Sequence, residues 1–198
     1  MKSSLLRQVA SSVLADRGFD VRIKVGQGYL PGSRVVLAKD GKKIQAAVKA
    51  SQARMLGFTR QSDRSWRTLR AVGLVIAIVP SRRDPAGADV LAFPKRSLVR
   101  VFDRAWKALE TAKRPIGLNM PVFVPLDADP RKNVGHGVRD IKRLAIWSIH
   151  LTAAELAART SLKLERDYVI AFRRRYAAEH GVDVSAVKIL IEGDRNDQ

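Results

Sequence analysis

The sequence predicts an α/β (α+β) fold, in which a small mixed β-sheet of about five strands is flanked by helices and followed by a helical C-terminal extension. Three observations predict it. Apolar residues recur at helical spacing near the N-terminus, Asp40-Gly41 is a strong signal for a two-residue hairpin, and residues 72–79 are a continuous β-branched run typical of a strand buried on both faces. Apolar side chains make up 46% of the 198 residues, which is enough for a substantial core.

The first half of the chain predicts one helix followed by strands. The helix is expected to begin at Ser3 or Ser4, which can cap it, and to end at Gly18. Strands are expected at 21–25, 34–39, 42–50, 72–79 and 89–93. The last two are expected to pair. Pro94 suits the first turn of a helix, so a second helix is expected from there to about Lys113.

The second half predicts mainly helix. A short strand is expected at 122–124, and a short helical segment around 141–147. Thr152-Ala-Ala-Glu155 is a capping box that predicts a long helix ending near His180. Three regions follow from this pattern: a basic α/β domain at 1–126, a polar linker or exposed loop at 127–138, and a helical C-terminal region at 139–198 with a final strand at 187–191.

Positive charge dominates the chain. It has 37 Lys and Arg against 19 Asp and Glu, a net charge of +18. Residues 1–100 hold 20 basic and 6 acidic side chains, whereas residues 101–198 hold 17 and 13. Such an excess repels itself unless an anionic partner neutralises it, and nucleic acid is the commonest partner of this kind. The alternative is that the charge only maintains solubility.

Several function classes are disfavoured by what the sequence lacks. Without cysteine there is no disulfide scaffold, thiolate zinc site or cysteine nucleophile, and the three His residues have no metal-binding spacing. No Gly-rich nucleotide motif or GxSxG is present. No apolar run is long enough to span a membrane, and the N-terminal segment lacks the core of a signal peptide. We therefore expect no cofactor, no metal, no membrane partner, and a cytoplasmic protein, with association with the nucleoid as an option.

Over about residues 4–112, the chain resembles the PD-(D/E)XK, or restriction-endonuclease-like, fold. The resemblance lies in the order of its elements: a helix, three strands with a tight hairpin, a basic segment, a buried strand, a further strand and a helix. The resemblance implies an acid at the start of the second strand and an acid-x-Lys triplet on the third, which together hold a metal ion. Here the second strand begins Gly32-Ser33-Arg34, and the third carries Ala47-Val48-Lys49. The lysine matches, but both acids are missing. The resemblance therefore implies a degenerate member that binds DNA and has lost the metal site.

Candidate contacts to nucleic acid are mostly basic. Arginine binds phosphate with a bidentate fork, and an aromatic ring can stack on an unpaired base. The candidates are Lys42, Lys43, Lys49, Arg54, Arg60, Arg64, Trp66, Arg67, Arg70, Arg82, Arg83, Arg166 and Arg173. For Trp66 and the neighbouring Phe58, burial in the core is the favoured alternative. For the basic residues of the C-terminal helix, ordinary ion pairs with nearby acidic residues are favoured over contact with nucleic acid.

The function that these observations favour is non-catalytic binding of double-stranded DNA through phosphate contacts. A metal-dependent nuclease with a displaced site, using Asp20 or Asp89, is a competing hypothesis. Asp40-Gly41-Lys42 has the letters of the triplet, but its place at a hairpin tip is explained by turn geometry. The composition is equally compatible with an RNA-binding protein, and the mixed-charge C-terminal helix with a module that binds an acidic protein. A homodimer formed through that helix is also compatible with the sequence.

Overall fold

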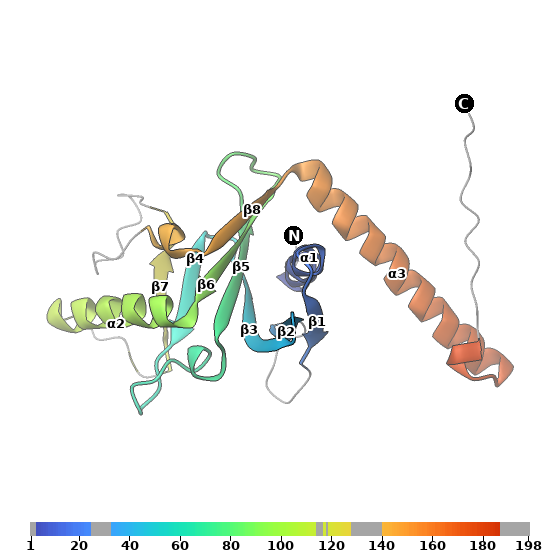
Figure 1. Cartoon of the computed structure of the whole chain (residues 1–198), viewed down its shortest axis with the longest axis horizontal. Helices are drawn as coiled ribbons and strands as arrows, with labels where there is room; N and C mark the ends of the chain where they lie inside the picture. Colours follow the sequence, from blue (N-terminus) through green and yellow to red (C-terminus); the bar gives the residue numbers. More distant parts are fainter. Residues whose placement is uncertain (1–2, 25–32, 114–116, 118, 128–139, 187–198) are drawn as a thin grey trace. The chain divides into compact units, whose positions relative to one another are not determined.

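The computed structural model describes residues 3–24, 33–113, 117, 119–127 and 140–186, without the side chains of 162–169 and 171–174. The chain divides into two compact units, residues 1–156 and 157–198 (Figure 1). The first unit is a mixed sheet flanked by helices, as the sequence predicts. The second contains most of the helix α3 (Ala153–His180) and the short 3-10 turn η4 (Val184–Ala186). No helix among the described residues has the length and apolar character needed to cross a membrane.

Six strands form the main sheet, in the order β1-β2-β3-β5-β6-β8. All neighbours are antiparallel except β3 and β5, which are parallel. The strands are β1 (Asp20–Ile23), β2 (Arg34–Lys39), β3 (Lys42–Ala50), β5 (Leu74–Pro80), β6 (Ala88–Pro94) and β8 (Trp147–Leu151). A separate antiparallel pair consists of β4 (Met55–Thr59) and β7 (Pro121–Pro125). The parallel step from β3 to β5 places the carboxyl ends of both strands at one end of the sheet.

A hydrophobic core covers each face of this sheet, because successive side chains of a strand point to opposite faces. On one face, α1 (Ser3–Asp16) packs on Val35, Val48 and Ile76. On the other face, α2 (Lys95–Thr111) and the β4–β7 pair pack on residues that include Val75 and Ala77. Every residue of β5 except Pro80 is buried. The expectation of a doubly buried strand at 72–79 is confirmed.

Two local signals have the geometry predicted for them. Asp40 and Gly41 adopt φ of 49° and 73°, the left-handed conformations that a two-residue hairpin turn requires, and join β2 to β3. At the start of α3, the backbone nitrogen of Thr152 donates to Glu155 Oε2 at 2.8 Å, and the nitrogen of Glu155 donates to Thr152 Oγ1 at 3.2 Å. The helix ends before Gly181, whose φ is 63°.

Two strands were not predicted. β4 lies in the basic segment, and β8 lies between the short helical segment expected around 141–147 and the long helix. In the expected segment itself, the 3-10 turn η3 covers Ile141–Leu144. β8 pairs with β6, and the residues up to 156 belong to the first compact unit. Most of the expected linker (128–138) and the expected final strand (187–191) lie outside the described residues.

Candidate nucleic-acid interface

Arg54 is the centre of a half-buried network of ion pairs. It follows the end of β3 with φ of 52°, and its side chain is only 10% exposed. Its guanidinium donates to Asp127 at 2.7 and 3.1 Å, to Asp89 at 2.9 Å and to the carbonyl oxygen of Pro80. Burial opposes the ionisation of both carboxyl groups, but these bonds outweigh it and lower the pKa of Asp89 and of Asp127. Arg54, predicted to contact phosphate, is thus held by two carboxylates within the fold.

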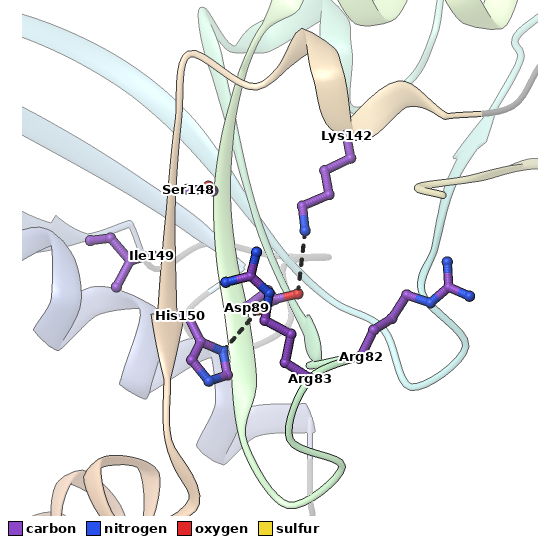
Figure 2. A pocket seen from close by; sticks show the side chains of 7 residues that line it. All are labelled: Arg82, Arg83, Asp89, Lys142, Ser148, Ile149 and His150. Carbon is purple, nitrogen blue, oxygen red and sulfur yellow. Dashed lines mark hydrogen bonds and ion pairs between the residues drawn. The ribbon is translucent and has the colours of Figure 1, made fainter. Parts of the chain in front are cut away.

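Asp89 also binds two further groups, each from a different element. His150 on β8 is its register partner across the sheet, and His150 Nδ1 lies 3.1 Å from Asp89 Oδ1. Lys142 reaches the same carboxylate from η3, with Nζ 3.8 Å from Oδ2. Figure 2 shows both contacts as dashed lines. Asp89 therefore has at least three basic neighbours, which leaves it poorly suited to hold the metal ion of a displaced nuclease site.

A pocket of about 270 Å³ opens beside this network. Arg82 and Arg83 line it from the loop after β5, Lys142 from η3 and His150 from β8 (Figure 2). Both arginines are exposed. Ser148, Ile149 and Asp89 complete the lining. Because the charge of Asp89 is balanced by Arg54, the pocket presents a surplus of positive charge to solvent.

Positive charges also gather where the resemblance implied acids. Arg34 at the start of β2 is directly opposite Ala47, and Lys49 is two residues further along β3. Arg34 and Arg7 of α1 are 9% and 8% exposed. Burial lowers the pKa of Lys49, and the like charges of Arg34 and Arg7 lower it further. Lys49 Nζ also lies 5.0 Å from the centre of the Phe58 ring.

We refer to Arg34, Lys49, Arg82 and Arg83 as the carboxyl-end cluster, because they lie at the end of the sheet where β3 and β5 finish. The opposite end carries a second group. Lys42 and Lys43 are the first residues of β3. The connection between β4 and β5 ends beside β3 at this end of the sheet, because the backbone nitrogen of Gly73 donates to the carbonyl oxygen of Gln45. The exposed residues Lys42, Lys43, Arg64, Arg67 and Arg70 form this hairpin-end cluster.

Arg60 and Trp66 lie within the fold. Trp66 is 2% exposed, packs edge-to-face on Phe102, and donates from Nε1 to Asp103 at 3.0 Å. Arg60 pairs with the same carboxylate at 3.3 Å and stacks on Trp66 and Trp106. Trp66 is therefore a core residue, which is the interpretation that the sequence favoured. Arg60 was expected to contact phosphate, but its side chain is only 13% exposed.

Sequence reasoning missed four site residues, Arg7, Arg34, Lys142 and His150, and the side chains of two candidates are not described. Lys142 and His150 were overlooked because their relation to Asp89 depends on the pairing of β8. The sequence does contain a signal for Arg7, which is seven positions before the buried Leu14 and so shares its helix face. The side chains of Arg166 and Arg173 lie outside the described residues. Among the described residues, no three His, Asp or Glu side chains gather closely enough to hold a metal ion.

Known proteins offer only a weak match to this chain. No family model and no curated protein matches the sequence. Among solved structures, a bacterial homing endonuclease, I-Ssp6803I, is similar to 72% of this chain and 89% of its own, with 17% identity and a TM-score of 0.37. A likeness this low supports no argument about activity.

Proposed function

We propose that this protein binds double-stranded DNA without cleaving it, through phosphate contacts at the carboxyl-end cluster. The observation that carries the proposal is the position of Arg82 and Arg83, two exposed arginines at the end of the sheet where Arg34 and Lys49 also lie. Burial lowers the pKa of Lys49, and the like charges of Arg34 and Arg7 lower it further, so the field at this end of the sheet is positive. Such a field attracts an anion and repels a divalent cation.

Phosphate is the anion that best fits this surface. Duplex DNA presents one charge per ~1.7 Å of helix axis, so several separated cations can each neutralise a phosphate and release counterions. Exposed arginines in loops suit such contacts, because they fix the position of the protein without reading the base sequence. Trp66 and Phe58 are buried, so neither ring is accessible for stacking on an unpaired base. Their burial supports duplex binding over single-strand binding.

Titration of a mixed-sequence DNA duplex, followed by fluorescence anisotropy at several salt concentrations, tests the proposal. We expect log K to fall linearly with log salt, with a slope of about 0.9 per neutralised phosphate. Absence of binding at low salt would refute it. An RNA duplex of the same sequence as competitor distinguishes DNA from RNA binding.

A matched pair of double variants locates the surface. Arg82→Ala with Arg83→Ala and Lys42→Ala with Lys43→Ala remove the same charge from opposite ends of the sheet, so their effect on the long-range field is similar. We expect the arginine variant to reduce the slope of log K against log salt by an amount equal to about two phosphate contacts, and the lysine variant to reduce it less. The reverse order would move the interface to the hairpin-end cluster. Cleavage of the duplex with Mg²⁺ or Mn²⁺ would contradict the non-catalytic part.

A further inference from the structure

The pocket beside Asp89 has features that a surface for the DNA backbone does not need. Arg82, Arg83 and Lys142 bring three permanent positive charges to a concave site of about 270 Å³. Asp89 contributes the only carboxylate among its lining residues, and Arg54 holds that carboxylate from behind at 2.9 Å. Including Arg54 and its second partner Asp127, the site retains a net charge of about +2, from the formal charges of these groups. The charge is therefore focused at one small hollow.

We propose that this pocket binds a phosphate monoester, namely the terminal phosphate of a nucleic-acid strand. A phosphodiester inside a strand carries one negative charge, whereas a terminal phosphate carries about −1.5 to −2 at neutral pH and offers three acceptor oxygens. The second charge matches the surplus of the pocket. The volume also lies just below the ~300 Å³ lower range of small-ligand pockets, which suits a phosphate group with part of its nucleotide. This inference rests on the proposed function, whose interface includes Arg82 and Arg83.

The fold positions the polar groups of the pocket before any ligand arrives. Asp89 is ionised, because the bonds from Arg54 and His150 outweigh the effect of burial and lower its pKa. An ionised carboxylate only accepts hydrogen bonds, so His150 must carry its proton on Nδ1, 3.1 Å from Asp89, and this fixes the orientation of the ring. Lys142 is likewise drawn toward Asp89, at 3.8 Å, while 41% of its side chain stays exposed to a ligand. Two of the lining side chains are therefore preorganised, which lowers the entropic cost of binding.

The experiment compares short DNA duplexes of one sequence that end in 5′-phosphate, 3′-phosphate or hydroxyl groups, with the full-length protein at fixed ionic strength. A phosphate that accepts charge-assisted hydrogen bonds from this pocket should bind roughly tenfold tighter than a hydroxyl end, or better. Lys142→Met should reduce that preference and leave the affinity for the hydroxyl-ended duplex nearly unchanged. Lys43→Met, at the other end of the sheet, should leave the preference intact.

The outcomes separate the two proposals. Equal affinity for phosphate and hydroxyl ends would overturn this inference and leave the proposed function standing. Failure of every duplex to bind at low salt would refute the proposed function and, with it, a strand terminus as the ligand. A thermal shift with inorganic phosphate alone provides a second readout. A rise in Tm that Lys142→Met abolishes, together with no preference among duplex ends, would show that the pocket takes a free phosphate and not a strand end.

Discussion

Replacement of Arg54 by Met tests whether the buried ion-pair network holds the sheet end together. Met retains much of the apolar stem and removes the guanidinium, so the change isolates the charge. Asp127 loses both of the hydrogen bonds that Arg54 donates to it, and Asp89 loses the one at 2.9 Å. The two carboxylate side chains are 17% and 10% exposed, so water can replace these bonds only in part.

The expected loss follows from this geometry. Breaking a buried ion pair by removing one partner costs about 3–5 kcal/mol, since an uncompensated charge remains. His150 and Lys142 still contact Asp89, so we expect the lower part of that range, about 3 kcal/mol. For a chain of this size the corresponding fall in Tm is roughly 6–12 °C. The exposed Arg67 provides the control, because Arg67→Met should change stability by less than about 0.5 kcal/mol.

The pH dependence should distinguish charge from lost packing. In the wild type, the lowered pKa of Asp89 and of Asp127 means that their ionised forms stabilise the fold above the unfolded pKa of ~3.9, and this contribution disappears as pH falls through the folded values. In Arg54→Met, only the charges of Arg82 and Lys142 still oppose the effect of burial on the pKa of Asp127, so protonation of this carboxyl group at low pH removes part of the cost of the substitution. The difference in stability between the two proteins should therefore shrink as pH falls from 7 toward about 4.

Urea unfolding monitored by tryptophan fluorescence measures this difference, because Trp66, Trp106 and Trp147 all lie in the first unit. A midpoint for Arg54→Met that matches Arg67→Met at pH 7 would refute the assignment of Arg54 to the fold. A difference that stays constant with pH would show that packing, and not charge, accounts for the loss.

Three further substitutions test other parts of the fold. Trp66→Ala should lower the free energy of unfolding by about 3–5 kcal/mol, measured by thermal denaturation, because Trp66 is buried. Replacing a tryptophan that is accessible for stacking would change it little. Gly57→Ala should lower the free energy of unfolding by roughly 1 kcal/mol, because the added Cβ would lie 2.5 Å from Phe123 Cε1. In a Phe123→Ala background, the same substitution should cost less. Lys49→Met should raise Tm, whereas Lys43→Met should not. Because the pKa of Lys49 is lowered in the folded state, its charge costs stability at every pH below that folded value. The cost falls as pH rises further and vanishes above the unfolded pKa of ~10.4.

Elements specified by neighbouring residues were the ones that the sequence predicted well. The turn at Asp40-Gly41 determines the register of β2 and β3, and Thr152 with Glu155 determines where α3 begins. Both signals act within four residues. β4 and β8 were missed because their partners are distant in the chain: Leu56 pairs with Val124, and Ile149 with Val90. Such strands are stabilised by tertiary pairing more than by their own propensity.

The same distance explains which site residues could be predicted. The sequence gives no reason to distinguish among the arginines of residues 54–70. In the structure, Arg54 and Arg60 are paired with acids within the fold, whereas the other arginines of this segment are exposed. The two carboxylates that bind Arg54 are 35 and 73 residues away, and the one that binds Arg60 is 43 residues away. No local pattern reveals these pairs. Arg64 and Arg67 are exposed, as the prediction of a phosphate-binding surface requires.

This division also strengthens the argument from charge. Arg54 and Arg60 neutralise two of the three charges of Asp89, Asp103 and Asp127, so these acids leave most of the exposed cations without an offsetting charge. The Arg70–Asp63 pair is more than half exposed on both sides, and such pairs contribute little. The positive surplus therefore falls on exposed loops and on the carboxyl-end cluster, where burial and neighbouring like charges lower the pKa of Lys49. The buried charge of Lys49 costs the fold stability, and a phosphate bound nearby would reduce that cost.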